Sequence, residues 1–261
     1  MKIRDWNKIK FLQKSKIEWP CPNCNSSALK IEKDKFHSTE TANSLDNREH
    51  EYWEIEWIHL IFSGILKCSS CGETVTMTGY GNVEHVHFYD HISNEYEEAL
   101  NEEYTPTFFH PTLKIFQISE NCPELVRNEI YDSFKLFWFD LPSCANKVRT
   151  SLELLLNEQK VNKTIAIKKG GRRRLKLHER IVEYKKKNKQ VADFLLAIKW
   201  IGNTGSHIGK LERNDLLDAY ELLDFSLSKL YDSKETELEK LQKEINKRKG
   251  VRKKTTRKKR K

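Results

Sequence analysis

The sequence has no long apolar segment. No stretch approaches the ~18 consecutive apolar residues that a membrane-spanning helix requires, so we expect a cytoplasmic protein without a membrane partner. The first nineteen residues are basic and lack an apolar core, so no secretory leader is expected. Hydrophobic residues make up only 38% of the chain, against 33% charged residues. This balance predicts a thin core and long charged helices.

Acidic residues are absent from the last ten positions. These positions hold eight lysine and arginine residues, and the other 251 residues carry a net charge of only +1. A segment with so much like charge and nothing apolar to bury is predicted to be disordered. We therefore assign residues 250–261 to a disordered basic tail. Its expected partner is nucleic acid or, second, an acidic protein surface, and the alternative is that it only aids solubility.

Cysteines are few, but four of the six fall in two CxxC pairs. Without a secretory leader, such pairs favour a metal over disulfides. Cys21, Cys24, Cys68 and Cys71 therefore predict a tetrahedral zinc site. Four thiolates leave no open coordination position, so the zinc is expected to be structural. A redox role is the alternative, although no thioredoxin-like βαβ pattern surrounds the pairs.

The character of the sequence changes near residue 105. Before it, alternating apolar positions and β-forming residues predict strands over 52–66 and 74–86, whereas the acidic segment 94–103 predicts a short helix or a loop. We expect a zinc-ribbon-like β module at 1–104. An extended connector is expected at 105–122, a segment that contains Pro106 and Pro111.

From Pro123 onward, apolar residues recur at helical spacing. Pro123 and Pro142 are each expected in the first turn of a helix, and further helices are expected at 175–187 and 192–201. A fifth, long helix is predicted from Asp215 to about Lys247, with Asn214 as its N-cap. The predicted fold class is α+β, mainly α, with a helical domain at 123–249 that ends in this long helix.

Residues 160–174 are predicted to form a basic loop around Gly170 and Gly171. A second basic run follows at 185–189. One face that carries both clusters would attract phosphates, whereas a solvated loop is the alternative. The predicted nucleic-acid-binding residues are Lys168, Lys169, Arg172, Arg173, Arg174 and Lys176.

The helical half also contains a recognisable series of segments. In order, they are CPELVRNEIYDSF, ANKVRTSLELLL, LLAIKWIGNTGSH and DLLDAYELLDFSLSKLY. Together they resemble a bacterial domain-of-unknown-function family that often follows a zinc ribbon and is found in or beside restriction-endonuclease subunits. That family is grouped with the HEPN (higher eukaryotes and prokaryotes nucleotide-binding) superfamily. The resemblance covers about 123–232 and implies a HEPN-like helical bundle.

The resemblance also implies candidate catalytic residues. HEPN ribonucleases cleave RNA without a metal, through an arginine, a polar residue and a histidine that meet at a dimer interface. Asn203 and His207 match this motif, but the arginine position falls on Gly202. Glycine is alternatively expected just past a helix end, where positive φ is needed. Lys199, one turn earlier, offers a point charge but not the planar fork of arginine.

Arg149 completes the set of candidate catalytic residues: His207, Asn203, Lys199 and Arg149. Arg149 and Glu153 are four residues apart on a predicted helix, so they are expected either to pair with each other or, by the resemblance, to link to the 203–207 loop.

The favoured function is a homodimeric, non-catalytic module that binds RNA or DNA or a partner protein. The resemblance implies that it is accessory to bacterial restriction or phage defence. Two alternatives stay open, namely a metal-independent ribonuclease acting through His207, and a structural adaptor that dimerises through the bundle.

Overall fold

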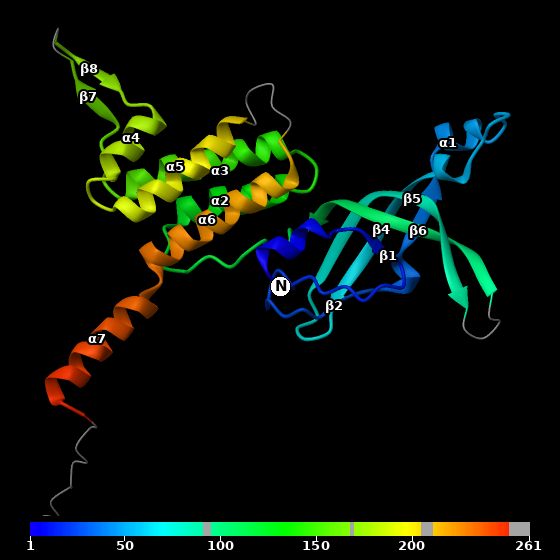
Figure 1. Ribbon diagram of the computed structural model, residues 1–261, viewed down its shortest axis with the longest axis horizontal. Helices are drawn as coiled ribbons and strands as arrows, with labels where there is room; N and C mark the ends of the chain where they lie inside the picture. The colour runs from blue at the N-terminus through cyan, green and yellow to red at the C-terminus, as the bar shows by residue number, and fades with distance from the viewer. Residues whose placement is uncertain (91–94, 168–169, 205–210, 251–261) are drawn as a thin grey trace, which may run out of the picture.

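The computed structural model describes residues 1–90, 95–167, 170–204 and 211–250 (Figure 1). The chain is α+β, with 44% helix and 24% strand. A sheet formed by the N-terminal part and a group of helices formed by the C-terminal part lie side by side (Figure 1). None of the helices in the described ranges combines the length and the apolar composition that a bilayer crossing requires.

The N-terminal part is a curled antiparallel sheet that forms a half-barrel. The strand order is β1–β6–β5–β4–β2, and β3 also pairs with β4. The predicted zinc-ribbon-like module is therefore wrong, because the two CxxC loops are attached to a much larger sheet. The strands are β1 (Phe11–Leu12), β2 (Leu29–Ile31), β3 (His37–Glu40), β4 (His59–Cys68), β5 (Thr74–Asp90) and β6 (Glu95–His110). The short helices of this part are η1 (Ile3–Asn7), η2 (Lys33–Lys35), α1 (Ala42–Asn47) and η3 (Ile55–Trp57).

Strand β4 shows how the sheet encloses a core. Its side chains alternate between exposed and buried along most of its length, as expected for a strand with one solvated face. On the buried face, the ring of Phe62 lies 5.7 Å from Phe11, 5.4 Å from Phe36 and 5.2 Å from Tyr104, measured between centroids. Such aromatic contacts favour a curved sheet, whose concave face gathers the rings.

The β5–β6 hairpin corrects the prediction of a short helix or loop at 94–103. Strand β6 pairs with β5 from Glu95 to His110, with a bulge between Thr78 and Gly79. A Cβ atom on Gly79 would lie 2.1 Å from the Thr105 carbonyl oxygen, so only glycine fits here. The bulge also lies opposite Pro106, which has no N–H to donate to the ladder.

The segment expected as a connector at 105–122 is instead part of the core. Strand β6 includes its first six residues. Most apolar side chains beyond the strand are buried, with exposed fractions of 0% for Leu113, 3% for Ile115 and 8% for Phe116. Because these side chains are buried, the sheet and the helices share one continuous apolar cluster.

Aromatic rings join the sheet to the helices. Phe109 of β6 packs edge-on against Trp19 at 5.3 Å and against Trp138 at 4.6 Å. Trp138 also packs against Trp6 of η1 at 5.4 Å. Trp6 is fully buried, and its Nε1 donates a hydrogen bond to the Ile115 carbonyl at 2.9 Å.

The helical part packs around Tyr220. The Tyr220 hydroxyl lies 2.8 Å from Ser133 Oγ and 3.0 Å from Cys144 Sγ, so three helices meet at one buried polar group. Pro142 lies in the first turn of α3, as predicted, whereas Pro123 is the N-cap of α2, one residue before its first turn. The helices are α2 (Glu124–Leu136), α3 (Leu141–Glu158), α4 (Leu177–Tyr184), α5 (Lys189–Thr204), α6 (Arg213–Tyr231) and α7 (Ser233–Arg248).

The predicted single helix from 215 to 247 is wrong. It is interrupted at Asp232, whose ψ of 119° is extended, and α7 then projects away from the other helices (Figure 1). The N-cap of α6 is Glu212 rather than Asn214. There, the Asp215 carboxylate accepts a hydrogen bond from the Glu212 N–H at 2.8 Å.

Two further expectations for the helical part are corrected. Helix α5 continues through Gly202 to Thr204, so Gly202 does not end the helix. The segment 160–174, expected to be a loop, contains a two-stranded hairpin formed by β7 (Thr164–Ala166) and β8 (Arg172–Arg174). This hairpin lies beyond α4 at the end of the helical part (Figure 1).

We expect Trp6→Ala to lower the free energy of unfolding by about 3–5 kcal/mol, because it removes a fully buried ring from the joint. Trp6→Phe keeps an apolar ring but loses the hydrogen bond to Ile115, so we expect it to lower the free energy of unfolding by about 1–3 kcal/mol. Urea denaturation measures both. Tyr52→Ala, at a side chain that is 72% exposed, is the control. Equal free energies of unfolding for Trp6→Ala and Tyr52→Ala would contradict the importance of Trp6 for the contact between the sheet and the helices.

Candidate metal centre and basic surface

Two loops with the same backbone hydrogen bonding hold the four cysteines. In the first loop the Cys21 carbonyl accepts from the Asn25 N–H at 2.9 Å, and in the second the Cys68 carbonyl accepts from the Gly72 N–H at 2.9 Å. Asn25 and Gly72 have positive φ values of 59° and 80°. A residue that tolerates the left-handed region therefore follows each CxxC pair and turns the chain away from it.

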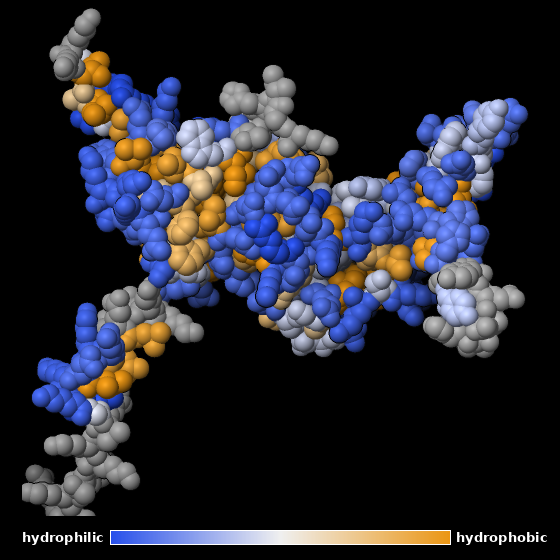
Figure 2. Space-filling view, viewed as in Figure 1, coloured by the Kyte–Doolittle hydropathy of each residue, from blue (hydrophilic) through white to orange (hydrophobic). Residues whose placement is uncertain are grey.

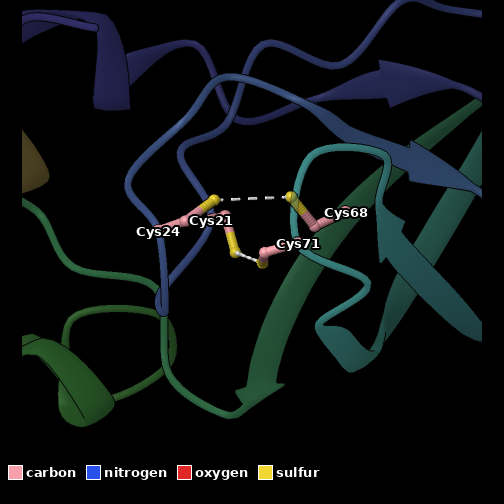
Figure 3. A group of neighbouring side chains, drawn as sticks. All are labelled: Cys21, Cys24, Cys68 and Cys71. Atoms are coloured by element: carbon pink, nitrogen blue, oxygen red, sulfur yellow. Dashed lines mark hydrogen bonds between the residues drawn. The ribbon is translucent and has the colours of Figure 1, made fainter.

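The four sulfur atoms point toward one another from these two loops (Figure 3). The Cys21 and Cys71 sulfurs are 3.7 Å apart, the Cys24 and Cys68 sulfurs are 3.6 Å apart, and all four lie within 4.8 Å of one another. Zn–S bonds of about 2.3 Å in a tetrahedron place sulfurs ~3.8 Å apart. The donor set and its spacing therefore fit a tetrahedral metal ion.

The surroundings of the sulfurs favour thiolates at two positions. The Ser26 hydroxyl lies 3.0 Å from Cys24 Sγ and 3.6 Å from Cys68 Sγ. Hydrogen bonding to Ser26 lowers the pKa of Cys24. Burial disfavours the Cys68 thiolate, but hydrogen bonds from Ser26 and from backbone N–H groups lower the pKa of Cys68 to about 6.

Cys21 behaves in the opposite way. Burial raises the pKa of Cys21 to about 12. A divalent cation would supply the charge that deprotonates such a thiol, so metal binding releases protons and weakens in acid. The prediction of a four-cysteine cluster is confirmed, and the cluster can hold a metal ion. In the part of the chain that is described, no other group of three or more Cys, His, Asp or Glu side chains is placed to do so.

The predicted basic side chains gather on the hairpin. Arg172, Arg173 and Arg174 form strand β8 and are all exposed, and Lys176 follows as the N-cap of α4. Lys168 and Lys169 lie outside the described residues. Residues 160–189 contain thirteen lysine and arginine residues against two glutamates. This part of the chain is therefore the most basic region of the described structure.

Two of the predicted catalytic positions, Arg149 and Lys199, lie at the contact between α3 and α5. A Cβ atom on Gly202 would lie 3.4 Å from Arg149 Cβ and 3.4 Å from the Ala145 carbonyl oxygen, so the two helices approach closely there. Lys199, one turn earlier, is 7% exposed. Its burial, and then the charge of Arg149, lower the pKa of Lys199. Asn203 is half-buried near the end of α5, and His207 lies outside the described residues.

The expected pair between Arg149 and Glu153 does not form. Glu153 instead lies 3.6 Å from Arg174 Nη2. Arg149 forms no ion pair with any described residue, and its buried Nε has no hydrogen-bond partner there. The sequence reading also missed Arg180, which is 5% exposed. The sequence feature that could have identified Arg180 is its place on the apolar face of α4, one residue before the buried Ile181.

The two parts of the chain correspond to two uncharacterised domains. Residues 9–109 match the family described as a domain of unknown function (DUF8608), and residues 131–248 match another domain of unknown function (DUF4145). No curated protein and no solved structure matches the chain. The first match ends one residue before the end of β6, and the second begins within α2 and covers all later helices. The expected uncharacterised domain is thus confirmed, whereas its grouping with HEPN proteins stays a prediction.

We expect purified protein to contain one metal ion per chain, and Cys68→Ser to lose it, since the variant leaves three thiolates. Mass spectrometry of acid-digested protein measures the metal. Ser70→Ala, an exposed residue in the same loop, is the control and should keep the ion. A strong chelator should lower the melting temperature of wild type and leave that of Cys68→Ser unchanged. Wild type with four free thiols and no metal would contradict the site.

Proposed function

We propose that the chain is a non-catalytic nucleic-acid-binding protein that contacts the phosphate backbone through the β7–β8 hairpin and α4. The observation that supports this most is the concentration of charge there, thirteen basic residues against two acidic ones in 160–189. Such a patch attracts polyanions and positions a backbone without reading sequence. The HEPN resemblance and the basic tail at 252–261 support the same function.

The contacts of the basic side chains divide them into two groups. Arg173 donates to both Glu179 carboxylate oxygens, at 2.9 and 2.6 Å, and these bonds join the hairpin to α4. Arg172, in contrast, donates only to neutral oxygens of Thr164. Lys186 is exposed and has no carboxylate partner among the described residues. Arg172 and Lys186 are therefore the side chains that we assign to phosphate contacts.

We further propose that the metal is Zn²⁺ and that its role is structural. Four cysteine sulfurs at tetrahedral spacing are the donor set that structural zinc prefers, and they leave no open position for a substrate. The site lies on the sheet and therefore supports the fold, whereas the basic hairpin contacts the nucleic acid. An accessory role in bacterial restriction or phage defence is our inference from the resemblance.

Binding is favoured over ribonuclease activity because of Gly202. The motif arginine falls on this glycine, which is buried where α5 meets α3. A Cβ atom alone would already contact both Ala145 and Arg149, so a longer side chain would push the helices apart. The planar donor that would stabilise charge on the phosphate is therefore missing from the motif position.

We expect the affinity for a 20-nucleotide RNA or DNA to fall steeply with salt. Arg172→Gln with Lys186→Gln should weaken binding at low salt. It should also reduce the slope of log K against log[salt] by about 0.7–0.9 for each phosphate that the variant no longer neutralises. Fluorescence anisotropy over 50–300 mM KCl, in EDTA-free buffer, measures this. Lys30→Gln with Lys33→Gln, two exposed lysines on the sheet part, is the matched control.

Other outcomes separate the alternatives. Equal slopes for wild type and the Arg172/Lys186 variant would contradict the assignment of these contacts. RNA fragments that form in EDTA with wild type but not with His207→Ala would instead support a ribonuclease. The absence of both binding and cleavage at low salt would leave the dimeric adaptor.

Helix α7 carries a surface suited to the predicted homodimer. Leu238, Leu241 and Ile245 are 57%, 40% and 39% exposed and lie three and four residues apart, on one face (Figure 2). This is the spacing of a coiled-coil seam. We therefore propose a second copy of the chain as the partner of this face.

Leu241→Glu should convert this dimer to a monomer, because it places two like charges at the centre of the seam. Sedimentation velocity over a range of concentrations measures the change. Lys243→Glu, two residues away and outside the seam, should leave the dimer intact. A wild-type chain that stays monomeric at about 100 μM would contradict the proposal, because a dimer with a Kd of ~1 μM is almost fully formed at that concentration.

A further inference from the structure

A pocket of about 550 Å³ opens between α3, the β7–β8 hairpin and the start of α4. It lies within the size range of small-molecule sites, which is about 300–1,000 Å³. Leu175 and Leu177 supply apolar walls. Its charged lining comes from all three elements and consists of Arg149, Glu153, Lys163, Arg174, Lys176 and Arg180.

The charges in this pocket do not balance. Five of the six charged lining residues are cationic, and the one carboxylate, Glu153, lies 3.6 Å from Arg174 and also attracts the more distant charge of Arg180. Arg149, Lys163, Lys176 and Arg180 form no ion pair within 4.0 Å with a carboxylate of any described residue. The excess of cations creates a positive electrostatic potential in the pocket, which favours the binding of an anion with more than one charge.

Arg180 shows that part of this charge is buried. Its Nη1 donates to the Glu153 carbonyl at 3.3 Å, and its Nη2 donates to Asn157 Oδ1 at 2.7 Å. A longer contact of 3.4 Å joins Nη2 to the Val161 carbonyl. All three acceptors are neutral, and burial lowers the pKa of Arg180. The carboxylates of Glu153 and Glu183 attract this charge without a direct contact, and burial outweighs them. An anion in direct contact with Arg180 would offset the remaining cost of burying the cation.

Arg149 extends the cationic wall to α5. No described residue accepts a hydrogen bond from its guanidinium, and its Nε is buried without a partner. The buried Lys199 lies close enough that the Arg149 charge contributes to its lowered pKa. Two neighbouring cations without a carboxylate repel each other, so the α3–α5 contact also favours an anion on the pocket side.

We propose that this pocket binds a phosphate monoester, either the terminal phosphate of a nucleic-acid strand or that of a free mononucleotide. A monoester carries nearly two negative charges at neutral pH and three acceptor oxygens, which suits several converging cations better than a carboxylate or an internal diester. Arginine forks favour phosphate geometry. The strand-end case rests on the proposed nucleic-acid binding, whereas the mononucleotide case does not.

The experiment compares probes that differ only in the phosphate. Isothermal titration calorimetry of the full chain would use 5′-AMP, 3′-AMP and adenosine. It would also use ten-nucleotide strands with a 5′-phosphate, a 3′-phosphate or neither. We expect at least one phosphorylated probe to bind five-fold or more tightly than its unphosphorylated counterpart. Arg149→Gln and Lys163→Gln should each abolish this preference, and Lys33→Gln, an exposed lysine on the sheet part and outside the pocket lining, should preserve it.

Arg180 is left unchanged because it also holds α4 against α3. Lys163 is exposed, so Lys163→Gln keeps the test valid even where Arg149→Gln disturbs the helix contact. A preference in AMP but not in strands identifies a free mononucleotide, and the reverse identifies a strand end. Equal binding of all phosphorylated and unphosphorylated probes overturns the pocket while leaving backbone binding intact. A preference that survives both pocket variants overturns it as well.

Discussion

The packing of Trp138 against rings from the sheet is the contact on which the arrangement of the whole chain depends. Trp138 follows α2, Trp6 precedes β1 and Phe109 lies near the end of β6, so residues from both ends of the sheet part enclose one ring of the helical part. The hydrogen bond from Trp6 to Ile115 adds the connecting segment to the same joint. Edge-to-face rings fix orientation as well as distance. The cysteine loops and the basic hairpin therefore belong to one framework.

A metal ion held by the four cysteines would stabilise the edge of the sheet where the strands are shortest. Strands β1 and β2 have only two and three residues, and such short strands contribute little on their own. Leu29 of β2 pairs with Cys68 at the end of β4. An ion bound to both loops would link the segment before β2 to the β4–β5 turn, across a sequence separation that costs entropy to close. We infer that the metal stabilises this edge, far from the basic hairpin.

Local patterns were predicted well from the sequence, and long-range pairing was not. The CxxC spacing predicted the cysteine cluster because each pair forms within its own tight turn. Strand β6 was missed because its acidic first half lacks apolar alternation, and its pairing with β5 is set by the hairpin. The break at Asp232 had a signal, because Asp232 followed by Glu235 is a capping pattern. Arg180 also had a signal in the sequence, because it is a cation on an apolar helix face. The pocket that Arg180 lines could not be predicted, because it depends on the tertiary contact between α3 and α4.

The distribution of charge argues against solubility as the reason for the basic segments. Outside 160–189 and 252–261, the chain has thirty-six acidic and twenty-six basic residues, so the rest of the molecule is acidic. Solubility is served by dispersed charge, and by acidic residues more than by basic ones. Clustering thirteen cations within thirty residues instead raises the self-repulsion of the hairpin and α4. A bound anion relieves that repulsion, and the acidic remainder would repel the same anion. A polyanion would therefore approach this protein through its basic segments and not through the acidic remainder.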